Sequence, residues 1–194
     1  MLSDKEINNI LKEKLPSLVK KDIVDFLNIT IYKKINNKEI ILKSGSISKK
    51  AFLILEGTVR GYITNKEGVE KNILLRSEGI FVADARKLFK DEPQRFSFEA
   101  IGETHILLFN YRDFEALANQ NPNIMQLYLN ILKEAVVRLN YRVESLITMT
   151  NEERYLDLLK LNPKFLDRVY DKHIANYLGI TPVSLSRIIN RIKE

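Results

Sequence analysis

A change of hydrophobic period near residue 29 constrains the fold of this chain more than any other feature. From residue 29 to residue 82, short β-branched or aromatic runs alternate with turn signals about ten residues apart, at Asn36, Asn37, Gly45, Gly57, residues 65–68 and Gly79. Short strands separated by regularly spaced turns are typical of an all-β barrel or sandwich. A further strand pair is expected at residues 95–100 and 105–110.

Helical periodicity flanks this β region on both sides. Residues 1–27 read as helix interrupted at Pro16, and residues 111–119 and 123–148 follow the β region with helical spacing. Within the long segment, apolar residues fall on two interleaved seven-residue repeats. Valine and leucine at these positions favour a parallel two-stranded coiled coil, although the helix could instead pack on its own β region. The predicted dimer seam is Leu129, Leu132, Val136, Leu139, Val143 and Leu146.

The sequence TNEE at residues 150–153 marks the start of a further helix. Thr150 can accept a hydrogen bond from the Glu153 amide while the Glu153 carboxylate reaches back, which is the capping-box pattern. This helix is expected to end near residues 162–163. We therefore expect a domain boundary at residues 148–151.

Composition excludes several classes of function. The chain has no cysteine and two histidines, so thiolate chemistry, disulfides and Cys-based metal sites are excluded, and neither a metal site nor a cofactor is expected. No apolar stretch approaches the roughly 20 residues of a membrane span. The N-terminus has no signal-peptide core, so a cytoplasmic protein without a membrane partner is expected. The net charge of +6 favours anionic partners.

The final stretch, from His173 onwards, matches a helix-turn-helix pattern. Counted from Asp171, the small residue Ala175 stands at position five and Gly179 at position nine. Glycine can adopt the left-handed conformation that ends the first helix, and Thr181 can cap the second. The apolar positions four, eight, ten, fifteen and eighteen, which lock the two helices together, are Ile174, Leu178, Ile180, Leu185 and Ile188.

The outward face of the second helix predicts DNA contacts. At about 100° per residue, Arg187 and Val183 fall opposite the apolar face, where Arg187 can contact guanine O6 and N7 and Val183 a thymine methyl group. His173 is expected to be an exposed polar residue at the start of the first helix. The residues expected against DNA are Thr181, Pro182, Val183, Ser184, Ser186, Arg187, Asn190 and Arg191.

Several of these stretches resemble the Crp/Fnr family of bacterial transcription regulators. The matching segments are FLILEGTVRGYI, NKEGVEK and SEGIFV in the β region and IANYLGITPVSLSRI near the C-terminus. The resemblance covers nearly the whole chain. It implies a homodimer in which an effector lies in the β-roll beside the long helix. It also implies that two recognition helices enter successive major grooves of a palindromic site.

The resemblance implies an α+β fold. It predicts an N-terminal β-roll (a double-stranded β-helix or jelly roll, like a cyclic nucleotide-binding domain) with flanking helices, a long dimerisation helix and a C-terminal winged helix-turn-helix. The expected domains are a β-roll sensor at 1–121, the dimerisation helix at 122–148 and the DNA-binding domain at 149–194. The implied partners are double-stranded DNA and a second copy of the chain. RNA polymerase stays a candidate partner, with no residue that identifies a surface for it.

The segment that would hold cyclic AMP departs from the family pattern. GIFVADARKLF has Ala83 and Asp84 where Gly-Glu is expected, and EPQRFSFEA has Gln94 and Arg95 in place of Arg and Ser/Thr. Cyclic AMP is therefore not the expected effector. A different anionic effector, or none, stays open. The residues considered for this pocket are Arg76, Phe81, Asp84, Arg86, Arg95 and Ser97.

Two other classes of function compete with a DNA-binding regulator. The main alternative is a nucleotide-binding signalling module whose helix-turn-helix makes only protein contacts. The outward Arg187, Asn190 and Arg191 favour DNA over this alternative. An enzyme is not expected, because the sequence has no paired histidines, no cysteine and no glycine-rich phosphate loop before a helix.

Overall fold

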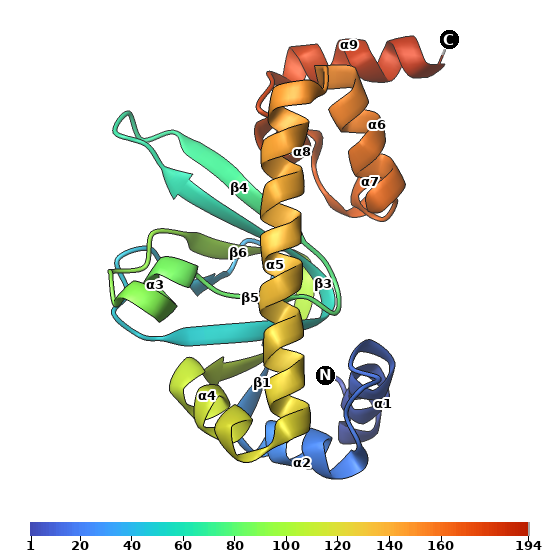
Figure 1. The fold of residues 1–194 in the computed structure, drawn as a ribbon. Helices are drawn as coiled ribbons and strands as arrows, with labels where there is room; N and C mark the ends of the chain where they lie inside the picture. The colour runs from blue at the N-terminus through green and yellow to red at the C-terminus, as the bar shows by residue number, and fades with distance from the viewer. Residues whose placement is uncertain (194) are drawn as a thin grey trace.

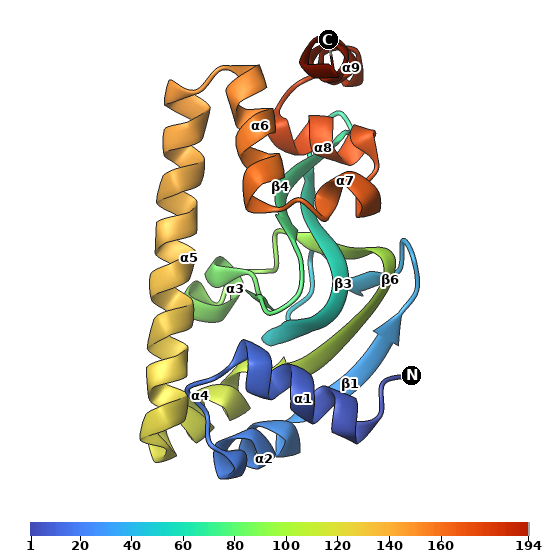
Figure 2. The same cartoon turned by 90° about the vertical axis from the view of Figure 1, so that its right-hand side faces the viewer.

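The computed structural model describes residues 1–193 and has three parts, a β-roll, a long helix and a C-terminal helical unit (Figure 1). Helices cover the base of the β-roll, and the long helix runs from that base along one side to the helical unit at the opposite end (Figure 2). This arrangement confirms the predicted α+β class. In residues 1–193 no helix combines the length and apolar character that a membrane crossing needs.

Two N-terminal helices, α1 (Asp4–Lys14) and α2 (Lys20–Asn28), lie at the base of the β-roll. The buried Asp22 carboxylate on α2 accepts hydrogen bonds from the side-chain amides of Asn121 and Asn123, at 2.7 and 2.9 Å. These bonds tie the base to the start of the long helix. The apolar side chains buried beneath α1 and α2 are Ile7, Leu11, Ile23 and Phe26.

The β-roll is built around two long antiparallel strands, β3 and β6. Among the described residues its strands are β1 (Thr30–Ile35), β2 (Ile40–Leu42), β3 (Lys50–Thr64), β4 (Glu70–Arg76), β5 (Phe81–Val82) and β6 (Ser97–Asn110). The main strand order is β1-β6-β3-β4, with β2 paired to β6 and β5 paired to β3. Each of the other strands therefore forms its hydrogen bonds with β3 or β6.

The structure corrects the strand pair predicted at residues 95–100 and 105–110. These two segments do not pair with each other, because residues 97–110 form the single strand β6, with Gly102 inside it at a φ of 75°. Both halves pair instead with β3. Phe98 lies opposite Gly61, and Ile106 lies opposite Ile54. The 15 residues of β3 offer a partner to each half, so Gly102 bends the strand without reversing it.

Helix α4 (Tyr111–Gln120) leads into α5 (Pro122–Thr148), which has 27 residues. Asn121 caps α5 by accepting hydrogen bonds from the amides of Asn123 and Ile124. Early apolar side chains of α5, such as that of Ile124, are buried against the β-roll. Farther along, the helix leaves a row of apolar side chains 42–60% exposed, namely Leu129, Val136, Leu139, Val143 and Leu146.

Four helices form the C-terminal unit, α6 (Asn151–Leu161), α7 (Phe165–Arg168), α8 (Asp171–Leu178) and α9 (Pro182–Lys193). The capping box at the start of α6 is confirmed, since Thr150 Oγ1 accepts from the Glu153 amide at 3.2 Å and the Glu153 carboxylate accepts from the Thr150 amide at 2.7 Å. Residues 149–193 contain no strand, so this part of the chain shows the helix-turn-helix without the predicted wing.

Gly57 is expected to be the glycine least tolerant of a side chain in the β-roll. A Cβ there would lie 2.6 Å from Thr104 Oγ1 and 2.7 Å from the Glu103 backbone oxygen, at a φ of 100°. Gly45 has a similar φ of 85° but no neighbouring atom within 4 Å. Gly45→Ala should lower the free energy of unfolding only by the cost of placing alanine in the left-handed conformation, about 1–2 kcal/mol. Gly57→Ala should lower the free energy of unfolding further; equal losses in chemical denaturation would contradict this steric account.

Candidate nucleic-acid interface

Gly179 sets the turn between α8 and α9. Its φ of 76° is left-handed, as predicted, and its amide donates to the carbonyls of Ala175 and Asn176. The next amide, that of Ile180, donates to the Ala175 carbonyl at 3.0 Å, which completes the closure of the helix end. A Cβ at Gly179 would meet no atom within 4 Å, so glycine is needed here for its backbone conformation alone.

Helix α9 starts with a side-chain cap from Thr181. Its hydroxyl accepts a hydrogen bond from the Ser184 amide at 3.1 Å, and its carbonyl accepts from the Leu185 amide at 3.0 Å. Pro182 occupies the first turn, where its lack of an amide hydrogen costs nothing. The sequence therefore fixes the first turn of α9, and with it the direction in which the outward side chains point.

The inner face of α9 is held by a small apolar core. Ala175 and Leu185 are both fully buried, and Ile188 is 6% exposed. The small side chain of Ala175 lets the two helices approach closely at their crossing. The same cluster includes Phe165 on α7 and continues to Leu75 and Ile101 of the β-roll, so the two parts share this core.

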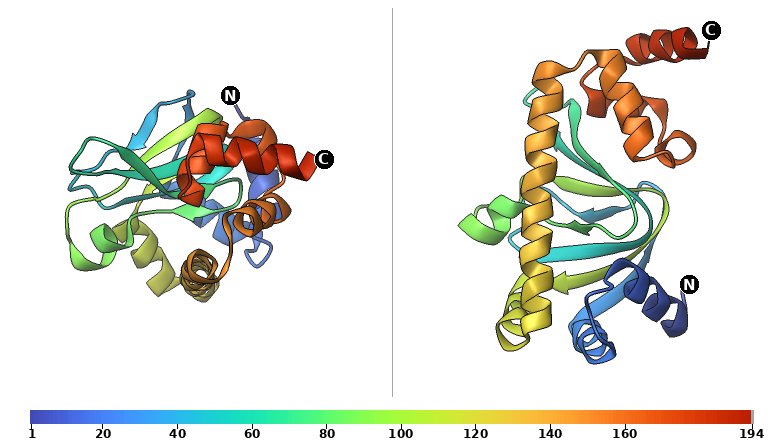
Figure 3. Two further views of the ribbon diagram at one scale, coloured as in Figure 1. Left: turned by 90° about the horizontal axis from the view of Figure 1, so that it is seen from above. Right: turned by 45° about the vertical axis from the view of Figure 1, so that its right-hand side comes forward.

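The outer face of α9 is open to solvent and largely polar. Viewed along the long axis, α9 lies across the end of the molecule (Figure 3). Arg187 makes no hydrogen bond or ion pair with another residue of the described chain, whereas Arg191 pairs with Glu152 on α6 at 2.8 Å. An exposed ion pair of this kind is weak and can be exchanged for an anion. The predicted contact residues, all exposed except the half-buried Ser184, are Thr181, Pro182, Val183, Ser184, Ser186, Arg187, Asn190 and Arg191.

Helix α8 docks on strand β4 through paired asparagines. The Asn72 amide donates to Asn176 Oδ1 at 2.6 Å, and Asn176 Nδ2 donates to the Glu70 carbonyl at 2.8 Å. Asn72 Nδ2 also donates to the carbonyl of His173 at 3.1 Å. These bonds join the helical unit to the sheet edge and orient α8, to which α9 is attached.

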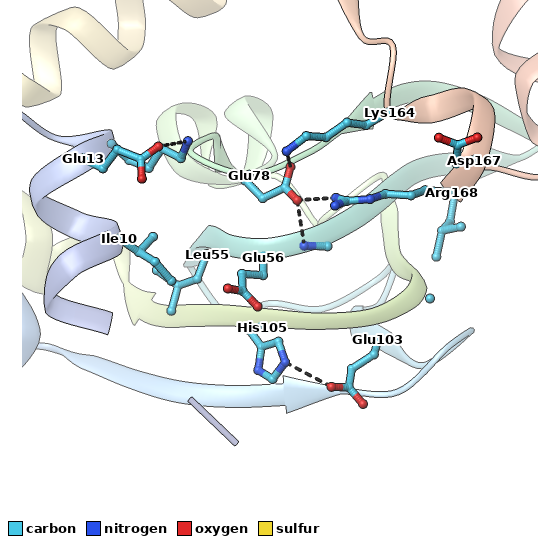
Figure 4. A pocket seen from close by; sticks show the side chains of 14 residues that line it. Ile10, Glu13, Leu55, Glu56, Glu78, Glu103, His105, Lys164, Asp167 and Arg168 are labelled. Carbon is cyan, nitrogen blue, oxygen red and sulfur yellow. Dashed lines mark hydrogen bonds and ion pairs between the residues drawn. The ribbon is translucent and has the colours of Figure 1, made fainter. Parts of the chain in front are cut away.

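A second polar contact joins the unit to the β-roll beside an open groove of about 780 Å³ (Figure 4). The Glu78 carboxylate pairs with Arg168 on α7 and lies 4.0 Å from the Lys164 ammonium. Burial would raise the pKa of Glu78, but the hydrogen bond from Arg168 and the two positive charges together lower it below its ordinary value. The contact is therefore an ion pair at neutral pH.

The structure corrects the expectation that His173 is exposed. Its side chain is half-buried where α8 meets the β-roll. Burial, with smaller contributions from the charges of Arg60 and Lys172, lowers the pKa of His173 to about 4, against the opposing effect of Glu99 and Glu70. His173 is therefore neutral at physiological pH.

Asp84, which was considered for the effector pocket, is committed to the protein backbone. It is 1% exposed and caps α3 (Ala85–Lys90) by accepting from the Arg86 amide at 3.0 Å. Its other oxygen accepts from the Arg95 amide at 2.6 Å. Gln94, which replaces the expected arginine, is also buried and donates to the Phe96 carbonyl. Neither side chain is free to grip a ribose or a phosphate, so these residues do not fit a cyclic nucleotide.

The remaining residues considered for the effector pocket do not converge. Arg86 pairs with Glu92 at 2.8 Å, and Arg95 is exposed. Ser97 Oγ accepts from the Ser44 amide. The side chain of Phe81 packs in the apolar core of the β-roll. Arg76 lies elsewhere, in a separate cavity beside α5 and Tyr177.

The cavity between α3, β6 and α5 also argues against a nucleotide in the β-roll. It has a volume of about 130 Å³ and is lined mainly by apolar and aromatic side chains, including Phe89, Tyr111 and Tyr128. Small-molecule sites usually have roughly 300–1,000 Å³. This cavity is too small and too apolar for a charged nucleotide.

Sequence reasoning missed the residues that hold the helical unit on the β-roll. The partners lie far apart in the chain, 104 residues for Asn72 with Asn176 and 90 for Glu78 with Arg168. No motif or periodicity links them. Only the folded chain brings these pairs together.

Comparisons with known proteins agree with this fold. Residues 32–121 match the cyclic nucleotide-binding domain family. FixK2 from Bradyrhizobium japonicum has a similar structure, with a TM-score of 0.72 at 18% identity over 85% of each chain. CLP from Xanthomonas campestris, described as a c-di-GMP-responsive global regulator, gives a TM-score of 0.71 at 13% identity over 90% of this chain and 92% of its own.

A third similar structure, from Eubacterium rectale, is described as a transcriptional regulator of the Crp/Fnr family. Its TM-score is 0.69 at 14% identity, over 92% of this chain and 85% of its own. A sequence comparison with curated proteins gives no match. Residues 32–121 thus match the cyclic nucleotide-binding domain family, and most of the chain shares its fold with these three proteins.

The half-buried His173 should make stability depend on pH. Because its folded pKa of about 4 lies below its ordinary value of 6.5, the unfolded chain binds more protons between these values, and stability falls as the pH drops through this window. Glu78, lowered below 4.5, contributes mainly at lower pH. The free energy of unfolding, measured with denaturant at pH 7 and at pH 5, should differ less between the two pH values for His173→Gln than for the natural chain. An identical difference would contradict this assignment.

Proposed function

We propose that this chain is a sequence-specific DNA-binding transcription regulator, acting in the cytoplasm as a homodimer on a palindromic operator. The observation that carries the proposal is the outer face of α9. There Arg187 is exposed and has no partner among the described residues, on a helix whose inner face is fixed by buried Leu185 and Ile188. The net charge of +6 favours a polyanion such as DNA.

In this proposal α9 lies in a DNA major groove. Arg187 donates two hydrogen bonds to a guanine, and Val183, which is 61% exposed, contacts a thymine methyl group. Thr181 and Ser184, at the start of the helix, suit phosphate oxygens. Asn190 and Arg191 contact the backbone, with Arg191 exchanging its pair with Glu152 for a phosphate. Ser186 and Pro182 complete the contact surface.

The exposed row on α5 supports a dimer. Five apolar side chains at seven-residue spacings are 42–60% exposed in the single chain, and with the half-buried Leu132 they form one seam. A coiled coil would remove this apolar surface from water. Two copies joined along α5 would place their α9 helices at the same end of the assembly. Half-sites about one helical turn apart, roughly 34–36 Å, would then suit the dimer.

The proposal does not include control by cyclic AMP, because the side chains of Asp84 and Gln94 form hydrogen bonds with backbone groups. An unidentified effector of another kind is compatible with the fold. RNA polymerase would be a partner of an activator, and its contact surface is a separate question from DNA recognition.

The test of the proposed function is selection from a random duplex pool by the full chain at near-physiological salt. Salt is needed because non-specific phosphate binding falls steeply as salt rises, while specific binding survives. Enrichment of a palindrome with half-sites about one turn apart would support the proposal. Absence of any enriched sequence, with residual binding lost as the salt concentration rises, would favour a module whose helix-turn-helix makes only protein contacts.

Arg187→Ala should weaken binding to the selected operator by about 1–3 kcal/mol and relax the preference at one base pair. Arg112→Ala, at an exposed arginine on α4 away from the helix-turn-helix, serves as the control and should bind as the natural chain does. Fluorescence anisotropy with the operator and its single-base variants measures both effects. Equal losses on all sequences would make Arg187 a phosphate contact rather than a base contact.

Leu139→Asp should convert the dimer into monomers, because it puts a charge into the middle of the seam at a side chain that is 60% exposed in the single chain. Leu166→Asp on α7 is the matched control, since this leucine is 50% exposed but lies outside the seam. Sedimentation at micromolar concentration distinguishes the two species. A Leu139→Asp chain that still sediments as a dimer would rule out the coiled-coil seam.

A further inference from the structure

A second cavity, of about 300 Å³, lies between the three parts of the molecule. Strand β4 contributes Arg76, helix α5 contributes Arg138 and Arg142, and helix α6 contributes Arg154. Helix α8 closes the cavity with Tyr177. Figure 1 shows α5 running past the β-roll and reaching the helical unit. The cavity is therefore formed only when all of these elements are in place.

The four guanidinium groups have little anionic compensation. Arg138 pairs with Glu134 on its own helix, but within residues 1–193 Arg76, Arg142 and Arg154 have no ion pair with a carboxylate. Their hydrogen bonds go mainly to neutral oxygens, such as that from Arg76 to the Leu75 carbonyl at 2.8 Å. The Nε atom of Arg154 is buried without any hydrogen-bond partner.

Asp157 is the acidic side chain that lines this cavity among the described residues. It accepts a hydrogen bond from Tyr141, an interaction that raises the pKa of Tyr141 to about 12. One carboxylate faces four arginines, so the cavity carries excess positive charge. Burial is the largest effect and lowers the pKa of Arg76 and of Arg142; Tyr177 opposes it, and the neighbouring arginines add a smaller lowering effect. The charged forms are thus destabilised by burial and by one another, as expected for clustered cations with little anionic compensation.

The rest of the cavity wall suits a planar or apolar group. The Arg142 guanidinium lies 4.2 Å from the centre of the Tyr177 ring and donates to the Tyr177 carbonyl. Apolar side chains, among them Val137, Leu158 and Leu178, form other parts of the lining. Sites for small phosphorylated ligands usually combine arginines, which bind the phosphate, with an aromatic and apolar wall, which contacts the rest of the ligand.

We propose that this cavity binds a small phosphate-bearing molecule, with its phosphate held by Arg76, Arg142 and Arg154 and its body packed towards Tyr177. The volume, at the lower end of ordinary ligand sites, suits a mononucleotide or a smaller phosphorylated metabolite. The site is separate from the β-roll cavity beside α3, with which it shares no lining residue. It also contacts none of the outward residues of α9.

The test is isothermal titration calorimetry with the full chain, without DNA, in chloride buffer of constant ionic strength. Inorganic pyrophosphate and adenosine monophosphate are the two probes. Pyrophosphate tests recognition of the phosphate alone, and adenosine monophosphate tests whether the rest of the ligand is also recognised. Saturable binding of at least one probe, with one molecule per chain, is expected. Absence of saturable binding by both probes would overturn the proposal. Because DNA is left out, this outcome does not depend on whether the chain is a transcription regulator.

Substitutions locate the binding within the molecule. Losing a charged hydrogen-bond donor costs about 1.5–3 kcal/mol, so Arg76→Gln should raise the dissociation constant by about tenfold or more. Arg95→Gln, at an exposed arginine of the β-roll, is the matched control and should leave it unchanged. Equal affinity of Arg76→Gln and the natural chain would overturn the proposal. If Arg76→Gln does not fold by circular dichroism, Arg142→Gln, which removes another of the three arginines proposed to hold the phosphate, takes its place with the same expectation.

Discussion

The antiparallel pairing of β3 with β6 is the constraint on which the rest of the structure depends. Each of the other described strands pairs with one of these two, so no part of the β-roll forms without them. The pair also places the other two parts. The chain leaves β6 directly into α4 and then α5, while β3 turns back into β4, the strand on which α8 docks. The close approach at Gly57 fixes how the two strands meet. Their register therefore sets the distance between the long helix and the helical unit.

The contact between the helical unit and the β-roll is both apolar and polar. The apolar cluster around Phe165 and Leu185 also includes Leu75 on β4 and Ile101 on β6, so it continues across the contact. The Asn72–Asn176 hydrogen bonds and the Glu78–Arg168 ion pair join the same two parts. Hydrogen bonds fix an orientation because they are directional, while buried apolar side chains oppose separation. The helical unit is therefore held on the β-roll in a defined orientation.

Local signals in the sequence predicted local structure well. Gly179 and the Thr150–Glu153 box act through backbone conformation and nearest-neighbour hydrogen bonds, and both occur where expected. The errors concern residues whose surroundings come from distant parts of the chain. The sequence predicts two strands on either side of residues 101–104, because the long partner strand that keeps β6 continuous is remote in sequence. The sequence predicts an exposed His173, because β4, on which α8 docks, is about 100 residues away in the chain. Asp84 resembled a ligand residue by position, but its carboxylate caps the next helix.

The arginine cavity and the outer face of α9 are linked by geometry. Without an anion, the positive charges of Arg76, Arg142 and Arg154 repel one another and favour separation of β4, α5 and α6. A phosphate bound as proposed would attract all three arginines and so favour the arrangement in which β4, α5 and α6 stay together. Since α9 is fixed to α8 by the turn at Gly179, a ligand in the cavity would favour one direction of α9 over others. Thermodynamic linkage then requires that DNA, if it selects one of these directions, changes the affinity for the ligand by the same factor.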